Sequence, residues 1–334
     1  MSKTIPEIVD LASAFYGSAV LFSALDCGIF AAVENASGNA TAKAVAEAQG
    51  LSLRGATLLM DACVAEGLLE KDGETYSNTE AGKLALVPGG AADLSKAICY
   101  NRDVYPLWGK LNDFAKTGKP VEPPKVHLGD DPARTRAFAL AMRSRAFAIG
   151  RSVVPMVDLT GCEKLLDLAG GPGAYAELLA KANPGLKCVT VDVPGISAVA
   201  RECVREEGLS DRIECREGDY HTDEYEAETY DAVTIFGALH QESPERICDI
   251  LARANRALKK GGRLFVLDMM TDSTHTNPPF SALFGLNMAL STDNGWVFSD
   301  EEIKSWMRKT GFVPGETQTV KPPMPHWLVS AVKE

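Results

Sequence analysis

The chain has 334 residues and a formal net charge of −11 at pH 7. Nucleic acids and anionic membranes attract basic surfaces, so this charge argues against either as a partner. We therefore expect a small-molecule partner. The length suits two domains, each with its own core.

Eight cysteines are scattered along the chain without a C-x-x-C pair. This spacing favours neither a zinc site nor a redox motif. We find no secretory signal pattern and no apolar run long enough to span a bilayer. The cysteines are therefore expected to be reduced, and the protein is expected to be cytoplasmic.

Residues 1–115 are predicted to be mainly helical, because apolar residues recur there with helical periodicity. The exception is Gly67–Ser77, which reads as two short strands around the Asp72-Gly73 turn. A hairpin after a set of helices is the order of a winged helix. The predicted helical segments cover residues 5–30, 42–48, 53–66 and 91–111.

A winged helix often binds DNA, but the segment Leu53–Cys63 carries one arginine among small and apolar residues. A recognition helix needs basic and polar side chains for phosphates and base edges. The apolar helices, such as residues 19–30, instead favour burial against a second copy of the chain. We expect a homodimer built on this region.

Residues 116–157 are expected to be a linker and an interdomain helix, since a Pro-rich passage at 117–124 precedes a helical pattern at 132–157. From residue 158 to 334 strand and helix patterns alternate. This alternation predicts an α/β fold with a doubly wound, mostly parallel sheet. Two closing strands are expected at 316–320 and 326–332.

The segment Leu165–Tyr175 contains an apolar strand, a glycine-rich turn and the start of a helix. Such a turn lets the backbone approach a ligand and directs free helix N–H groups toward it. A second strand ends at Asp192, and a third acid stands at Asp219. A nicotinamide-binding dehydrogenase is disfavoured, because the third glycine of G-x-G-x-x-G would fall on Ala176.

The predicted strand at residues 230–239 delivers His240 at its carboxyl end, where open α/β sheets place their ligands. A neutral imidazole can remove a proton near physiological pH, so His240 is the candidate general base. The alternative is a histidine that caps the helix starting near Ser243. The other histidines, at 127, 221, 275 and 326, are expected to be surface or local structural residues.

These motifs, with ALH at 238–240, LKKGGRLFVLD at 258–268 and FGLNMALST at 284–292, resemble the class I small-molecule O-methyltransferases of the caffeate, hydroxyindole and hydroxyneurosporene type. The resemblance covers nearly the whole chain, including the dimerisation region. It implies S-adenosylmethionine as the cofactor, S-adenosylhomocysteine as the product and no metal. It also implies that His240 is the base and that Asp268 holds it in place.

The resemblance further implies two sets of binding residues. The cofactor would contact Asp167, Ala169, Gly170, Gly171, Gly173, Asp192, Val193, Gly218, Asp219, Tyr220 and Phe236. The acceptor pocket would be formed by Phe138, Met142, Phe280, Phe284, Asn287 and Met288. Helix-spaced aromatic and methionine side chains also suit ordinary core packing, and that alternative stays open.

The chain departs from the family pattern at several positions. Ala169 replaces the first loop glycine, Gln241 and Glu242 replace an Asp-Trp pair, and Val297 replaces a glutamate that flanks the histidine. With one acid fewer beside the base, C- or S-methylation of a small metabolite is an alternative to O-methylation of a hydroxyl or phenol. A non-catalytic protein that binds S-adenosylmethionine is the other alternative.

Overall fold

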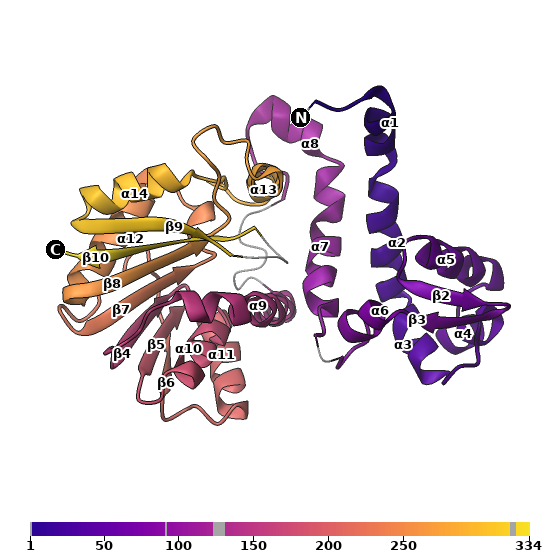
Figure 1. Cartoon of the computed structure of the whole chain (residues 1–334), viewed down its shortest axis with the longest axis horizontal. Helices are drawn as coiled ribbons and strands as arrows, with labels where there is room; N and C mark the ends of the chain where they lie inside the picture. Colours follow the sequence, from indigo (N-terminus) through magenta and orange to yellow (C-terminus); the bar gives the residue numbers. More distant parts are fainter. Residues whose placement is uncertain (1, 91, 123–130, 321–324) are drawn as a thin grey trace. The chain divides into compact units, whose positions relative to one another are not determined.

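The computed structural model describes residues 2–90, 92–122, 131–320 and 325–334. Contacts between residues divide the chain into two compact units, Met1–Asp103 and Val104–Glu334. Figure 1 shows both, coloured along the sequence. The finer division into 1–115, 116–157 and 158–334 stays a prediction.

The first unit is a helical winged-helix domain, as predicted. Its three strands form an antiparallel sheet in the order β1-β3-β2. Gly73 takes a φ of +56° in the turn between β2 and β3, a conformation that glycine adopts without strain. The elements are α1 (Ile5–Ser13), α2 (Phe15–Asp26), α3 (Ile29–Asn35), β1 (Ala40–Thr41), α4 (Ala42–Gln49), α5 (Leu53–Ala65), β2 (Leu69–Asp72), β3 (Thr75–Asn78) and α6 (Glu80–Ala85).

The segment Ile5–Asp26 corrects one expectation. It is 22 residues long and holds an 18-residue window with a mean hydropathy of 1.6, so by length and composition alone this helical segment could cross a membrane. The sequence reading overlooked it because the polar residues Glu7 and Asp10 interrupt the apolar pattern near its start. Large apolar side chains are exposed along it within this single chain: Ile5, Ile8, Val9, Leu11, Phe15 and Tyr16.

The second unit carries a seven-stranded sheet in the order β6-β5-β4-β7-β8-β10-β9. The first five of these strands are parallel, and β10 pairs antiparallel with both β8 and β9. The predicted mostly parallel sheet is confirmed. The strands are β4 (Lys164–Leu168), β5 (Lys187–Asp192), β6 (Ile213–Glu217), β7 (Tyr230–Phe236), β8 (Leu258–Asp268), β9 (Phe312–Thr319) and β10 (Trp327–Lys333).

The helices of this unit precede the sheet or connect its strands. α7 (Ser95–Trp108) starts in the first unit and ends in the second. The others are α8 (Leu111–Thr117), α9 (Pro132–Val153), α10 (Ala174–Ala182), α11 (Pro194–Glu206), α12 (Pro244–Ala257), α13 (Pro279–Ala289) and α14 (Asp300–Lys309), with short 3₁₀ turns η1 (Val154–Met156) and η2 (Leu239–Gln241).

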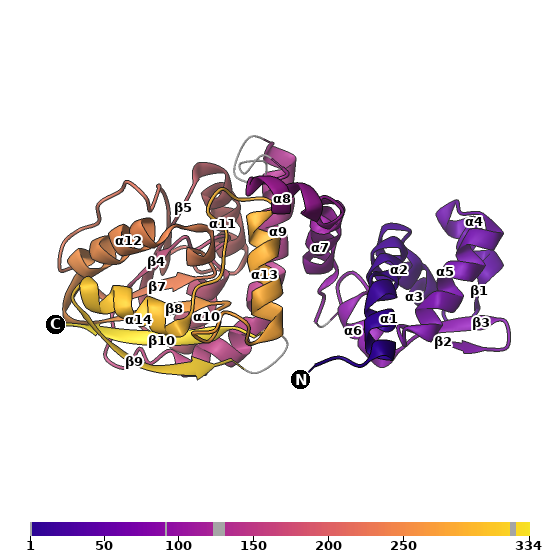
Figure 2. The ribbon, with the colours of Figure 1, turned by 90° about the horizontal axis from the view of Figure 1, so that it is seen from above.

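Helices cover both faces of the sheet, and the strand periodicity explains why. Leu165 and Leu166 are neighbours on β4, so they point to opposite faces. Leu165 packs in the core with residues of α9 and α10, whereas Leu166 packs in the core with residues of α12 and α14. Figures 1 and 2 show these two helical layers on either side of the strands. Strands buried on both faces are therefore continuously apolar.

β4 lies between β5 and β7. After β4 the chain adds β5 and β6 on one side of that strand, and then adds β7 and β8 on its other side. A crevice forms at the carboxyl ends of parallel strands where the strand order reverses in this way. The glycine turn follows β4, and His240 follows β7. The fold thus brings the two predicted sites to the same edge of the sheet.

Candidate active site

The turn after β4 has a conformation that depends on small residues. Ala169, Gly171 and Gly173 have φ values of +52°, +58° and +77°. At Gly170 the limit is space, because a Cβ there would lie 2.5 Å from Asp167 Oδ2 and nearer still to Thr190 Oγ1. At Gly171 no atom lies within 4 Å of the place where a Cβ would stand, so the backbone there is open to a ligand, and α10 begins directly after the turn.

Asp192 is fixed at the end of β5 by two backbone donors. The N–H of Gly171 donates to Oδ2 and the N–H of Val193 donates to Oδ1, both at 2.8 Å. Burial raises the pKa of this carboxyl to about 6, although the two hydrogen bonds favour its ionised form. The acid expected to bind the ribose is thus held in place by the glycine turn itself.

Asp167 lies buried below the same turn. Its Oδ1 accepts a hydrogen bond of 2.7 Å from Thr234 Oγ1 on β7. Burial raises the pKa of Asp167 to about 7, and the nearby Asp192 carboxylate adds to the shift. Two buried carboxyl groups, Asp167 and Asp192, therefore lie close together beneath the glycine turn.

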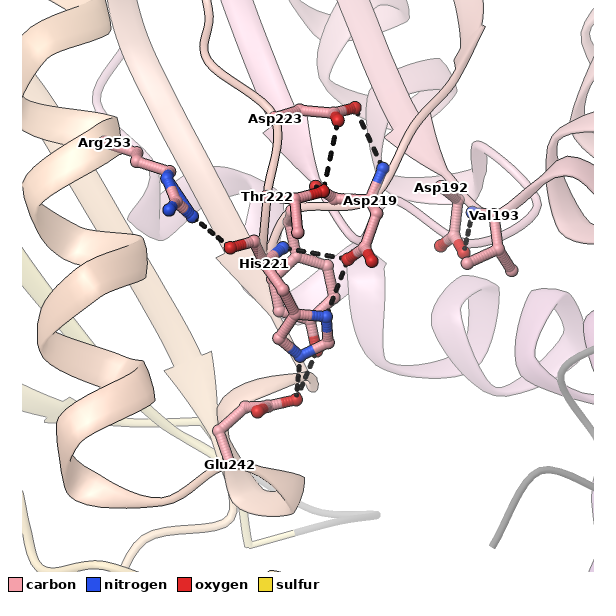
Figure 3. Close-up of polar contacts among 9 residues, drawn as sticks. Asp192, Val193, Asp219, His221, Thr222, Asp223, Glu242 and Arg253 are labelled. Carbon is pink, nitrogen blue, oxygen red and sulfur yellow. Dashed lines mark hydrogen bonds and ion pairs between the residues drawn. The ribbon is translucent and has the colours of Figure 1, made fainter.

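Asp219 follows β6 and is held by its own loop. Its Oδ1 accepts hydrogen bonds from the backbone N–H of His221 at 2.9 Å and lies 2.6 Å from His221 Nδ1 (Figure 3). Burial works against ionisation of Asp219, but these contacts with His221 hold its pKa below the usual value. The preceding Gly218 has no room for a side chain, because a Cβ there would lie 2.8 Å from Val191 Cγ1.

His240 lies buried in η2, and Asp268 ends β8 beside it. The ring Nδ1 is 2.6 Å from Asp268 Oδ1, and the backbone N–H of His240 donates to Oδ2 at 3.2 Å. Asp268 Oδ1 also accepts from the N–H of Met269 at 2.8 Å. This pairing orients the ring so that Nε2 is the nitrogen that can take a proton.

An apolar cluster lies on the other side of His240. The Phe284 ring meets the His240 ring edge to face, with centroids 5.1 Å apart. Phe284 packs with Met269, Met288 and Val297 in one buried cluster. Met269 was missed by sequence reasoning, although its place directly after Asp268 at a strand end was a usable signal.

The other predicted pocket residues are spread more widely. Phe280 is 44% exposed and stacks on Phe284. Asn287 Oδ1 accepts a hydrogen bond of 3.0 Å from Trp108 Nε1, a tryptophan that the sequence reading did not single out. Phe138 and Val193 both pack against one buried cluster formed by residues of α9 and α11. Met142 is half-buried on α9.

Phe236 and Tyr220, two predicted cofactor residues, contact side chains that were not among the predicted site residues. The Phe236 ring at the end of β7 meets Tyr175 edge to face at 4.9 Å. Tyr220 donates from its hydroxyl to Glu242 Oε1 at 2.7 Å. His221 is half-buried between two carboxylates, which fits the local structural role expected for it. His326 is buried, so a surface position is wrong for that histidine. His127 lies outside the described residues.

Acidic side chains and histidines come close together here, so a metal site has to be considered. Within residues 2–90, 92–122, 131–320 and 325–334, no group of three or more His, Cys, Asp or Glu side chains could hold a metal ion. The described geometry instead combines a glycine turn, three strand-end acids and a His–Asp pair beside an apolar wall.

Family models match this chain over most of its length. Residues 122–313 match the O-methyltransferase domain, and residues 9–88 match the O-methyltransferase dimerisation domain. The chain belongs to the O-methyltransferase family. It is an S-adenosylmethionine-dependent methyltransferase (EC 2.1.1.-), and the fold, enzyme class and cofactor expected from the sequence are confirmed.

Relatives within this family methylate different atoms. The chain is 30% identical to the tetracenomycin polyketide synthesis 8-O-methyl transferase TcmO of Streptomyces glaucescens, over 95% of this chain and 94% of that protein. It is 29% identical to the N,N-dimethyltransferase OxyT of Streptomyces rimosus, covering 98% and 96%. It is also 29% identical to an L-tyrosine C(3)-methyltransferase of Streptomyces lavendulae, covering 81% and 72%.

Among solved structures, the human N-acetylserotonin methyltransferase in complex with S-adenosylmethionine superposes with a TM-score of 0.88. The two chains are 26% identical, and the match covers 100% of this chain and 98% of the human one. The family is thus shared along the whole chain, while the methylated atom varies among relatives.

Proposed function

We propose that this methyltransferase transfers a methyl group to a hydroxyl or phenol of a small molecule, with His240 as the general base. The observation that carries the proposal is the His240–Asp268 pair, 2.6 Å apart at the same sheet edge as the glycine turn. The Phe284 cluster beside the ring gives an apolar surface for the acceptor.

The residues of the cofactor site fit S-adenosylmethionine. Gly171 has no atom within 4 Å of the place where a Cβ would stand, and its backbone N–H donates to Asp192. Asp192 would bind the ribose hydroxyls, and Asp219 with Tyr220 would bind the adenine. The remaining residues implied by the resemblance, including Val193 and Phe236, would line the same crevice.

S-adenosylmethionine, when bound, supplies an electrophilic methyl group on a sulfonium sulfur. His240 Nε2 would take the proton of the acceptor hydroxyl as its oxygen forms the new bond to the methyl carbon. The bond between that carbon and sulfur breaks, and the electron pair stays on sulfur. Asp268 keeps Nδ1 protonated, and the resulting imidazolium is stabilised by this carboxylate. The surrounding apolar side chains would exclude water from the reacting atoms.

The experiment is a turnover assay of wild type and His240→Ala with a panel of phenols and hydroxylated polycyclic aromatics. His240→Ala is expected to lower kcat by about 10²–10⁴-fold with little change in cofactor affinity. Retention of most turnover would exclude His240 as the base. The matched control is His275→Asn, because His275 is 46% exposed in its own loop.

Methylation of a carbon or sulfur atom is a second candidate. It is supported by Val297, which is buried in one cluster with Phe284 and Met288. Val297 stands where the family pattern described above has a glutamate beside the histidine. A nucleophile that needs little help in losing a proton suits a base with one acid partner. Methyl transfer to carbon that survives His240→Ala would favour this candidate over O-methylation.

We also propose a homodimer in which α1 and the start of α2 are covered by the second copy. The match of residues 9–88 to a dimerisation domain supports this, as do the exposed apolar side chains of Val9, Leu11 and Phe15. Of the segment 19–30 first expected to form the contact, Ile29 and Phe30 are buried within the unit itself.

We propose that this covering by a second copy keeps the segment out of the membrane, and that the protein is cytoplasmic. Light scattering at micromolar concentration should give the mass of a dimer, and Phe15→Asp should give a monomer. The protein should stay in the supernatant of a detergent-free ultracentrifugation. Recovery in the membrane pellet would contradict both the dimer contact and the location.

A further inference from the structure

Glu242 is a buried acid at a position where the resembling family carries tryptophan. It is 6% exposed, and it follows the loop that carries His240. Its Oε1 accepts a hydrogen bond from Tyr220 at 2.7 Å and lies 2.9 Å from His221 Nε2. Burying a carboxylate is costly unless it is hydrogen-bonded, and Glu242 meets this requirement through two side chains of another loop.

His221 bridges two carboxylates. Its Nδ1 is 2.6 Å from Asp219 Oδ1, and its Nε2 is 2.9 Å from Glu242 Oε1 (Figure 3). An ionised carboxylate can only accept hydrogen bonds, so both ring nitrogens must donate for both contacts to be favourable. With both carboxylates ionised, the geometry therefore favours an imidazolium. The His221 ring also stacks on the Tyr220 ring, with centroids 4.3 Å apart.

The backbone around Glu242 is also held by hydrogen bonds from Trp296. Trp296 Nε1 donates to the carbonyl of Glu242 at 2.8 Å, and the backbone N–H of Trp296 donates to the carbonyl of His240 at 2.9 Å. Arg253 donates to the carbonyl of His221. The loop of the catalytic histidine and the loop at the adenine end of the cofactor site are thus joined through one side chain.

We propose that Glu242 and His221 are positioning residues that hold Asp219 and Tyr220 in place for the adenine end of the cofactor. Because His221 occupies Asp219 Oδ1, the other carboxylate oxygen is left to face the ligand. The proposal rests on the proposed function, since it requires S-adenosylmethionine to contact Asp192 and Asp219.

The charges around His221 set the expected pH dependence. The hydrogen bond to Glu242 is the largest cause of a raised pKa for His221, and burial opposes it. The bridge is therefore intact below that pKa and is lost as the pH rises through it. The ionisable groups facing this site are Asp219, Tyr220, Glu242 and Arg253, with Asp223 and Arg246 beside Asp219.

The test is calorimetric titration of the full-length protein with S-adenosylhomocysteine between pH 7 and pH 9, above the pKa of about 6 of Asp192. Wild-type affinity is expected to fall as the pH rises through the pKa of His221. Glu242→Gln is expected to weaken binding about 3- to 10-fold at pH 7. The loss of affinity should also begin at lower pH than in wild type, because the carboxylate that raises the pKa of His221 is gone. The matched control Glu245→Gln, in an exposed acid at the start of α12, should behave as wild type.

His221→Gln provides a second variant that cannot titrate, and its affinity should be low and independent of pH over the same range. Thermal unfolding of each variant identifies any that fail to fold. Wild-type affinity and pH profile in both folded variants would overturn the proposal. If Asp192→Asn weakens binding in the same assay while these two do not, the cofactor site stands and only this inference fails. If wild type does not bind the probe at all, both fail.

Discussion

His240 contacts Asp268 through both its ring and its backbone: Nδ1 lies 2.6 Å from Oδ1, and the main-chain N–H donates to Oδ2 at 3.2 Å. The Asp268 carboxylate is thus held at both of its oxygens and gives the His240 ring a fixed acceptor. The acceptor-only carboxylate also fixes the proton on Nδ1, which leaves the Nε2 lone pair for the acceptor. The pair therefore controls both the direction and the tautomer of the base.

Asp268→Asn tests whether the carboxylate sets the tautomer of His240. The amide of asparagine can donate to Nδ1, which would place the ring proton on Nε2 and block proton removal. We expect kcat with a phenolic acceptor to fall about 10²–10⁴-fold, while calorimetric affinity for S-adenosylhomocysteine stays close to wild type. A variant that keeps its turnover would show that the carboxylate does not orient the base.

Asp192→Asn should weaken cofactor binding. A charged acceptor of hydrogen bonds from the ribose is worth roughly 1.5–3 kcal/mol, so affinity should fall about 10- to 100-fold. The pKa of Asp192 is raised to about 6, so wild-type affinity should be present above that pH and decline as the pH falls through it. Calorimetry at pH 5 and pH 7.5 measures both effects. Asp211→Asn, at an exposed acid, is the control and should change neither.

Two neighbouring positions of the glycine turn should respond in opposite ways. Ala169→Gly relieves a left-handed conformation that costs about 1–2 kcal/mol with a side chain, so the melting temperature should rise by a few degrees. Gly170→Ala forces a Cβ against Asp167 and Thr190, so cofactor affinity should fall at least about 10-fold. Equal tolerance at both positions, measured by thermal unfolding and calorimetry, would contradict the described turn.

Asp167→Asn should stabilise the cofactor-free protein at alkaline pH. The pKa of Asp167 is raised to about 7, so the folded state binds its proton more tightly than the unfolded state does. Stability contributed by this protonation is present near pH 4 and is lost as the pH rises to about 7. Asparagine removes the ionisation and can still accept from Thr234. The gain in melting temperature should therefore be clear at pH 8 and absent at pH 4, with no gain at either pH for the exposed Asp293→Asn.

Much of the fold could be predicted because its signals are local. The Asp72-Gly73 turn, the apolar run before the glycine turn and the acid that ends β5 follow from short sequence patterns, whereas Asp268 at the end of β8 was implied by the family resemblance. The boundaries were less certain: β9 begins at Phe312, four residues before the predicted strand, because its exposed pattern there is not strongly apolar. The apolar character of Ile5–Asp26 was underestimated.

The network around the site could not be predicted in the same way. Glu242 and His221 are 21 residues apart in sequence, and the local sequence marks each only as a polar loop residue. The fold places Glu242 Oε1 2.9 Å from His221 Nε2. The hydrogen bond between Trp108 and Asn287 joins residues 179 apart. Such contacts depend on the tertiary arrangement and cannot be predicted from a short segment. Strand-end acids and glycine turns can be, because each is defined by a few consecutive residues.

The central claim is that His240 removes the proton of an acceptor hydroxyl during methyl transfer. The most direct measurement is transfer of a labelled methyl group from S-adenosylmethionine to a panel of phenols by wild type and His240→Gln, with cofactor binding confirmed in both. We predict a labelled methyl ether with wild type and a rate about 10²–10⁴-fold lower with the variant. Methyl ether formation at the wild-type rate by a His240→Gln protein that binds cofactor normally would contradict the claim.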